Sequence, residues 1–219
     1  MAWWFGLLSA GSLGVAAWGF SPTNCSVSVE ANRAFSLHTD MDTFRQLLVR
    51  TKATEAILEH SGMELMDETT ESVDIDLSND SRPLRNFLRG KSKANVSATK
   101  HLKVKLNDPQ ISTTDLSLTQ ECKIGPKNIH VTTSADGPSG DLKSYSTTLK
   151  AVKGEQGTDV VLTIEMTVEV KVCSLFESQA RSRVQQAANK SLEDQEEALR
   201  SLAEDPVSGP SVGLVRAGR

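Results

Sequence analysis

Residues 160–172 constrain the fold more than any other part of the chain, because apolar side chains occupy every second position there. These positions are Val160, Leu162, Ile164, Met166, Val168, Val170 and Val172. A period of two predicts a long β-strand with one buried face and one exposed face. Apolar side chains then recur every three or four residues from 176 to 202, which predicts a long amphipathic helix. We therefore expect an α+β fold in which a curved antiparallel sheet packs against a long C-terminal helix.

The rest of the chain predicts further strands around one helical insertion. A first strand is expected over 25–37, followed by a helix that begins at Asp40 or Asp42 and ends near Ser61-Gly62. Further strands are expected at about 63–70, 71–78, 101–106, 114–122, 127–133 and 144–153. Turn residues separate these runs at spacings typical of antiparallel hairpins. The simplest arrangement is a meander of about seven strands.

Composition limits the chain to one main domain and excludes one class of partner. Its 219 residues, of which 38% are hydrophobic, suffice for one well-buried domain with appendages. Nucleic-acid binding usually needs a strongly basic surface, whereas the net charge of this chain is −4. Nucleic acid is therefore not an expected partner. Cys25, Cys122 and Cys173 form no CxxC or Cys/His cluster, which indicates reduced packing residues. A pair between Cys25 and Cys173 stays open, because both lie at strand ends.

The N-terminal segment differs in kind from the rest of the chain. Ala2–Phe20 carries no charge, and Trp3, Trp4 and Trp18 lie near its two ends. At roughly 1.5 Å per residue, such a helix matches the ~30 Å thickness of a bilayer core, and tryptophan is typical of membrane interfaces. We interpret residues 1–20 as an uncleaved transmembrane anchor, which predicts a single-pass membrane protein. A cleaved secretory signal and a buried core helix are the alternatives.

The order of these elements resembles a known superfamily. A first strand, a helical insertion, an antiparallel meander and a long amphipathic C-terminal helix are similar to the START-like, or SRPBCC, helix-grip superfamily over residues 25–204. The closing pattern VEVKVCSLFESQARSRVQQAANKSLEDQEEAL looks like its uncharacterised bacterial and plastid branches. Residues 205–219 are rich in Gly, Pro and Ser without periodicity, which predicts a disordered tail.

The resemblance implies a cavity between the sheet and the C-terminal helix that holds a lipid, sterol, quinone, isoprenoid or polyketide. We expect its lining on the inner face of the long strand and on the apolar stripe of the helix, at Leu162, Ile164, Met166, Val168, Phe176, Ala180, Val184 and Ala187. Small side chains at 180, 187 and 188 leave two alternatives open. Either the helix packs very close to the sheet, or a ligand fills the gap between them.

A basic stretch is the second candidate for a contact surface. No acidic residue lies between Asp80 and Asp108. The side chains that we assign to contact with a membrane or an acidic partner are Arg82, Arg85, Arg89, Lys91 and Lys93. Leu84 and Phe87 interleave apolar side chains with them, as in a segment that lies on a membrane surface. The alternative is a solvated loop and strand face that balances the acidic strand before it.

No catalytic or metal-binding motif stands out in the sequence. The histidines occur singly, at His38, His60, His101 and His130. Gly90-Lys91-Ser92 lacks the first glycine of a phosphate-binding loop, and the aspartates at 74, 76 and 80 lack the glycine and closing glutamate of a calcium loop. We expect no metal, no cofactor and no enzymatic activity.

Together these features predict a membrane-anchored START-like domain that binds a hydrophobic ligand, in lipid transfer or sensing. A tether would raise the effective concentration of lipid at the protein. One alternative is a non-enzymatic membrane-bound scaffold or assembly factor with a filled core and a protein partner. Another is a cyclase or hydrolase on the same fold, in which Tyr145, His130 or Glu165 performs acid–base chemistry.

Overall fold

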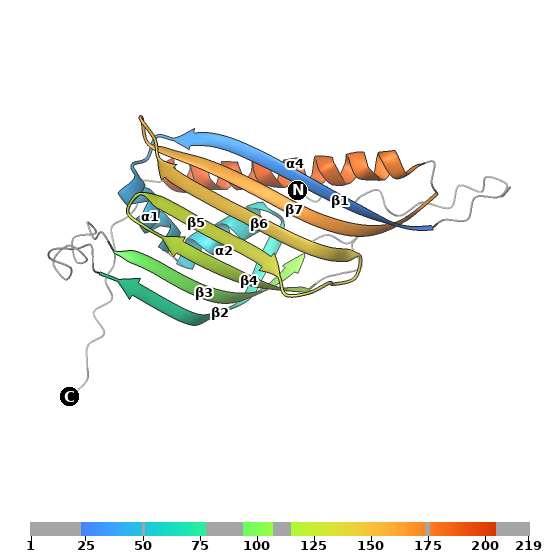
Figure 1. Cartoon of the computed structure of the whole chain (residues 1–219), viewed down its shortest axis with the longest axis horizontal. Helices are drawn as coiled ribbons and strands as arrows, with labels where there is room; N and C mark the ends of the chain where they lie inside the picture. The colour runs from blue at the N-terminus through green and yellow to red at the C-terminus, as the bar shows by residue number, and fades with distance from the viewer. Residues whose placement is uncertain (1–22, 50, 78–93, 107–114, 174–175, 205–219) are drawn as a thin grey trace.

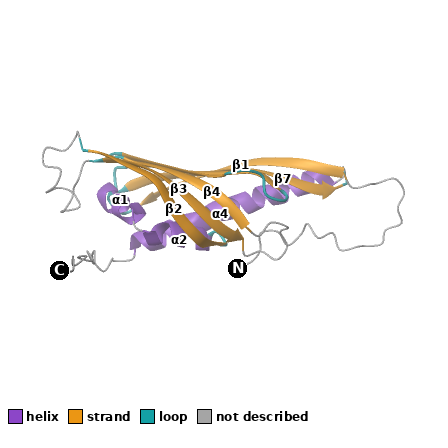
Figure 2. Cartoon of the chain, turned by 90° about the horizontal axis from the view of Figure 1, so that it is seen from below, coloured by secondary structure: helices purple, strands orange, loops and turns teal. Residues whose placement is uncertain are grey.

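One curved antiparallel sheet forms the body of the molecule, and its helices cover a single face, which we call the inner face (Figures 1 and 2). The computed structural model describes residues 23–49, 51–77, 94–106, 115–173 and 176–204. The elements are β1 (Thr23–Leu37), α1 (Met41–Val49), α2 (Thr51–His60), β2 (Met63–Asp76), β3 (Asn95–Leu106), β4 (Asp115–Ile124), β5 (Asn128–Ala135), β6 (Leu142–Lys153), β7 (Thr158–Val172) and α4 (Glu177–Glu204). The strand order is β1-β7-β6-β5-β4-β3-β2. The predicted curved sheet of about seven strands with a long C-terminal helix is confirmed.

The alternation over 160–172 produces the long strand that it predicts. From Val160 to Val170 of β7 the buried side chains are the apolar ones, with Ile164 fully buried and Glu165 exposed. Strand β7 pairs along its whole length with β1, from Thr23 opposite Val172 to Leu37 opposite Thr158. The first and last strands of the chain are therefore neighbours.

The helical insertion consists of two helices, where the sequence predicts one. The carboxylate of Asp40 caps α1, because its Oδ1 accepts hydrogen bonds from the backbone N–H groups of Asp42 and Thr43, each at 3.0 Å. Gly62 follows α2 with a φ of +78°, a conformation that favours glycine, and the chain turns there into β2. The apolar spacing continues from α1 into α2, so periodicity alone does not locate the break.

The prediction of separate strands over 63–70 and 71–78 is wrong, because β2 is one continuous strand. Its register against β3 shifts between Leu65 and Asp67 and again between Thr70 and Ser72. Each shift places an extra residue in β2 and interrupts its alternation. The interruption resembles a strand boundary in the sequence. Strand β3 also begins at Asn95, earlier than predicted.

Helix α4 covers the inner face and also closes one edge of the sheet. Its buried residues are Ala180, Val184, Ala188, Ser191, Leu192, Gln195, Ala198 and Leu199. Gln185 Nε2 donates to the carbonyl oxygen of Glu30 at 3.0 Å, and Arg200 Nη1 donates to that of Ser36 at 3.2 Å. Both carbonyls belong to the edge strand β1. Helix α4 thus occupies backbone acceptors that a free edge would leave open.

Several sequence predictions fall outside the residues that the structure describes. These are the anchor at 1–20, the tail at 205–219 and the basic residues Arg82, Arg85, Arg89, Lys91 and Lys93. Within the described ranges, none of the helices has the length and apolar character that crossing a membrane requires.

Candidate ligand cavity

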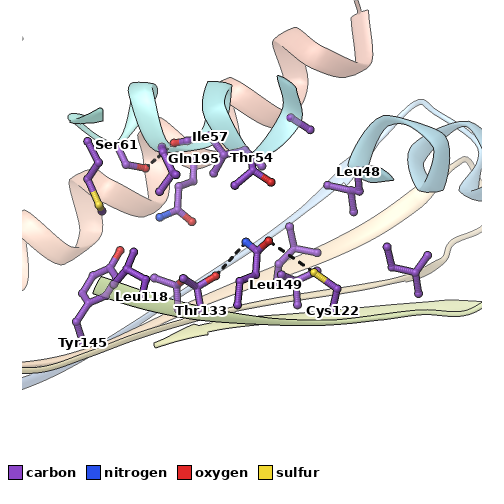
Figure 3. A pocket seen from close by; sticks show the side chains of 17 residues that line it. Leu48, Thr54, Ile57, Ser61, Leu118, Cys122, Thr133, Tyr145, Leu149 and Gln195 are labelled. Atoms are coloured by element: carbon purple, nitrogen blue, oxygen red, sulfur yellow. Dashed lines mark hydrogen bonds between the residues drawn. The ribbon is translucent and has the colours of Figure 1, made fainter. Parts of the chain in front are cut away.

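A small cavity lies between the inner face of the sheet and the two helices α2 and α4 (Figure 3). Its volume is about 80 Å³. The lining consists of Leu48, Ala53, Thr54, Ile57, Leu58, Ser61, Met63, Leu118, Gln120, Cys122, Ile124, Val131, Thr133, Tyr145, Thr147, Leu149 and Gln195. Apolar side chains predominate, and none of the lining residues carries a charge at neutral pH.

A row of polar side chains crosses the sheet at the floor of this cavity. Gln120, Thr133 and Thr147 lie opposite one another on the adjacent strands β4, β5 and β6. Gln120 Nε2 donates to Thr133 Oγ1 at 3.2 Å, and Cys122 Sγ donates to Gln120 Oε1 at 3.6 Å. Their positions share the inner-face parity with buried apolar neighbours such as Leu118 and Leu149. The row therefore faces the helices.

An ion pair extends the polar row toward the β2 edge of the sheet. Lys100 lies opposite Gln120, and its Nζ contacts Glu68 Oε1 at 2.6 Å. The two side chains are only 19% and 16% exposed. Their charges are thus paired with each other next to the cavity.

Gln195 brings a polar group to the cavity from the helix side. It lies on the buried face of α4, where its residue is 7% exposed. Its Nε2 donates to Ser191 Oγ at 3.4 Å, a long hydrogen bond. Figure 3 shows the amide pointing from α4 toward the sheet, with Thr133 and Tyr145 on the opposite side. No hydrogen bond between described residues involves Gln195 Oε1 or Tyr145 Oη, and neither atom is fully buried without a partner.

The titratable groups of the cavity stay neutral near pH 7. Burial raises the pKa of the Tyr145 hydroxyl well above its usual range. The pKa of the Cys122 thiol is also raised, mainly by burial. The charge of Lys100 opposes this increase in pKa, and the charge of Glu68 adds to it. A protonated phenol and a protonated thiol are poor acid–base and nucleophilic groups at neutral pH. The cavity is therefore suited to holding a neutral molecule.

The eight residues predicted as a ligand lining lie away from this cavity, four on β7 and four on or next to α4. Leu162, Ile164, Met166 and Val168 of β7 are buried in the core with Ala180 and Val184 of α4. Ala187 is half-buried, and Phe176 lies just before α4 with 52% of its surface exposed. None of the eight lines the cavity of Figure 3. Their assignment to a ligand stays a prediction.

The three candidate acid–base residues do not come together. Tyr145 lines the cavity, whereas His130 and Glu165 are exposed on the outer face of the sheet. Among the described residues, no three His, Cys, Asp or Glu side chains are grouped so that they could hold a metal ion. Cys25 and Cys122 are free thiols, and Cys25, Cys122 and Cys173 are all partly buried.

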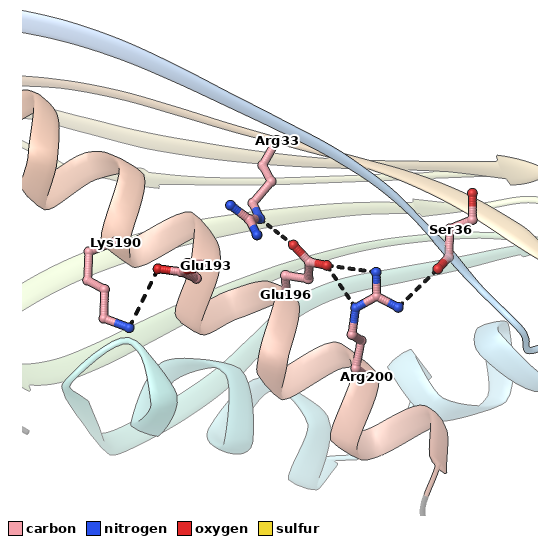
Figure 4. A network of polar contacts seen from close by, with 6 residues as sticks. All are labelled: Arg33, Ser36, Lys190, Glu193, Glu196 and Arg200. Atoms are coloured by element: carbon pink, nitrogen blue, oxygen red, sulfur yellow. Dashed lines mark hydrogen bonds and ion pairs between the residues drawn. The ribbon is translucent and has the colours of Figure 1, made fainter.

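A charged cluster holds α4 against β1 on the other side of the helix (Figure 4). Glu196 accepts a hydrogen bond from Arg33 Nε and another from Arg200 Nε, the second at 2.7 Å. The Arg200 guanidinium also lies 5.2 Å above the centre of the Phe35 ring. We interpret this cluster as a structural joint, because every contact joins α4 to itself or to β1.

The sequence contains a sign of the cavity, namely polar residues at positions that the alternation assigns to the buried face. In β4, β5 and β6 one polar residue occupies the apolar parity, at Gln120, Thr133 and Thr147. Gln195 similarly interrupts the apolar stripe of α4. Sequence reasoning missed these residues, because it searched for charged and catalytic motifs.

Comparisons with known proteins find similarity at the level of the fold. No family model matches the chain, and no curated protein matches its sequence. Among solved structures, the Zhui aromatase/cyclase from a Streptomyces species is 12% identical, with 81% of this chain and 94% of that chain covered and a TM-score of 0.46. A START superfamily protein from Mycobacterium smegmatis is 12% identical, with 80% and 97% covered and a TM-score of 0.43.

A plant enzyme gives a similar result. Norcoclaurine synthase from Thalictrum flavum is 11% identical to this chain, with 84% of this chain and 91% of that chain covered and a TM-score of 0.40. At such identities the likeness concerns the fold alone. The strand order and the long C-terminal helix agree with the helix-grip arrangement that the sequence predicts.

Proposed function

We propose that this domain binds a neutral, mostly apolar small molecule between its sheet and its helices α2 and α4. The observation that supports this proposal most is the cavity, whose lining is apolar with a few uncharged polar groups. Such a lining is typical of ligand sites. A charged ligand would lose its hydration without gaining a counter-ion from the lining. Because the lining offers no acid or base near neutral pH, we propose binding rather than catalysis.

The proposed ligand is a lipid, sterol, quinone or isoprenoid that the protein meets at a membrane. This part of the proposal rests on the uncharged segment 1–20, which we propose as the anchor. We expect the full-length chain to remain with membranes in carbonate extraction and a chain beginning at Ser21 to be released. A full-length chain in the soluble fraction would contradict the anchor but not the cavity.

A membrane-bound scaffold with a filled core is the second candidate, and the size of the cavity favours it. About 80 Å³ is well below the roughly 300–1,000 Å³ of typical ligand sites. A lipid-sized molecule would therefore enter only if α2 moved away from the sheet. The two candidates differ in whether the cavity ever holds a ligand.

Cavity-filling substitutions separate these candidates. Thr54→Ile together with Thr147→Ile places larger apolar side chains in the cavity from α2 and β6. We expect native mass spectrometry to detect a bound molecule in the parent protein and none in this variant, with an unchanged or higher melting temperature. Thr148→Ile, on the opposite face of β6, is the matched control and should retain the ligand. If the parent never carries a molecule, the scaffold is the better interpretation.

A further inference from the structure

The polar groups of the cavity converge on one place from both layers of the fold. The side chains of Gln120, Thr133 and Thr147 line the cavity from the sheet, and Gln195 lines it from α4. Figure 3 shows the Gln195 amide and the Thr133 hydroxyl on opposite sides of the same space. These four residues come from four different elements, so the arrangement is not a local feature of one strand or helix.

A glutamine at position 195 is expected to stabilise the fold less than an apolar residue would if its only role is to fill space. The surrounding stripe of α4 is apolar or small, and a leucine would fit the pattern of Leu192 and Leu199. A buried polar group that lacks partners destabilises the folded state, because it gives up its hydrogen bonds to water. The Gln195 carbonyl oxygen and the Tyr145 hydroxyl take part in no hydrogen bond between described residues, and neither belongs to the fully buried atoms that lack a partner. Both side chains line the cavity, so a molecule inside it could complete their hydrogen bonds.

We infer that the cavity recognises its ligand through an uncharged hydroxyl or ketone oxygen, held between Gln195 of α4 and the polar row of β4, β5 and β6. The inference rests on the proposed function and narrows the ligand class to oxygenated, neutral molecules. The Gln195 amide and the hydroxyls of Tyr145 and Thr133 can each donate or accept, so they accommodate either oxygen type. A pure hydrocarbon leaves these groups unpaired and is rejected for that reason.

The surroundings of the cavity also disfavour a charged ligand. Lys100 and Glu68, the charged residues beside the polar row, are paired with each other at 2.6 Å. Neither is therefore available to neutralise a charged ligand without breaking that pair. A carboxylate or an ammonium group should consequently bind much more weakly than a hydroxyl or ketone of similar size.

Three small aromatic probes test the inference on the full-length protein. Benzene, phenol and benzoate share a ring and differ in carrying no polar group, a neutral hydroxyl or a charge. We expect phenol to bind at least about tenfold more tightly than benzene in an NMR titration, with chemical-shift changes at residues of α2, β5 and β6, and benzoate to bind more weakly than phenol. Gln195→Leu should reduce the ratio of phenol to benzene affinity toward one.

Matched variants keep the test interpretable. Gln186→Leu makes the same change at an exposed position of α4 and should leave the preference intact. If Gln195→Leu fails to fold, Thr133→Val removes one hydroxyl of the polar row with little change in shape and should reduce the preference as well. Equal binding of benzene and phenol by the parent protein would overturn the inference and leave the proposed function standing. Binding of none of the three probes would count against both.

Discussion

At the scale of single residues, Glu196 is the centre of the contacts that fix α4 to β1. Burial alone would raise the pKa of its carboxyl group, but the hydrogen bonds from Arg33 and Arg200 hold it below its usual range. A carboxylate with a lowered pKa stabilises the fold at pH values above its unfolded pKa of about 4.3. That contribution is lost as the pH falls through the lower pKa of the folded state.

Glu196→Gln tests this account of the joint. The substitution removes the charge between two arginines that are each 40% exposed, so we expect a loss of about 1 kcal/mol in the free energy of unfolding at neutral pH. The difference between parent and variant should shrink as the pH falls from about 4.3 toward the lower pKa of the folded state, because the unfolded chain binds its proton first and the folded carboxylate follows. Urea unfolding at several pH values measures both effects. Glu193→Gln, at an exposed site on the same helix, should change stability less; an equal loss in both variants would contradict the joint.

At the scale of the elements, the two edges of the sheet are treated differently. Helix α4 closes the β1 edge, but the second half of β2 is exposed on both faces. Val73 and Ile75 are 56% and 47% exposed, and Asp74 lies between them on the other face. Acidic side chains along a free edge disfavour pairing with a second copy, since like charges would meet.

Asp74→Val removes one of these charges from the free edge. We expect the variant to self-associate as the protein concentration rises, because it creates an apolar run over residues 73–75 on a strand whose outer edge no other described strand pairs. Light scattering coupled to size exclusion measures the effect. Glu165→Val removes an exposed charge from β7, whose two edges are both paired, and should stay monomeric. Identical behaviour of both variants would show that charge loss alone, and not the free edge, controls association.

The packing of α4 on the sheet tests whether the small side chains at 180, 187 and 188 leave open space, as the predicted lining requires. Ala188 is fully buried, so the small side chains permit close packing of the helix on the sheet. We expect Ala188→Leu to cost about 1–3 kcal/mol through overpacking. Ala187→Leu, at a half-buried position, should cost less. If Ala188→Leu leaves the ligand-free protein as stable as the parent, open space exists there and the predicted lining gains support.

Sequence patterns predicted some of the helices and strands correctly and others not. Alternation located β1, β7 and the strands between them, because side chains on one face of a strand recur with a fixed period. It could not reveal the two bulges of β2, since a bulge changes the phase of the pattern in the same way as a turn does. The polar breaks at Gln120 and Gln195 are visible in the sequence, but a period does not specify how far a helix lies from a sheet, so they do not reveal the size of the cavity.

At the scale of the whole molecule, the pairing of β1 with β7 joins the two ends of the domain. Apolar periodicity correctly predicted a curved sheet and a long C-terminal helix, but it gives no information on which strands are partners. Contacts between residues so distant in sequence make the fold dependent on both of its ends. We therefore expect the described domain to unfold as one cooperative unit.

Removal of α4 tests this dependence. In a chain that ends at Cys173, the inner face loses the eight buried side chains that α4 contributes, and the β1 carbonyls of Glu30 and Ser36 lose their donors. An apolar sheet face and an open edge both promote association, so we expect an aggregated or unfolded product. A chain that ends at Glu204 retains the helix and should behave like the full-length protein in circular dichroism and urea unfolding. A monomeric chain ending at Cys173 with a cooperative unfolding transition would show that the sheet folds without its helix, and the cavity would then lose the wall that carries Gln195.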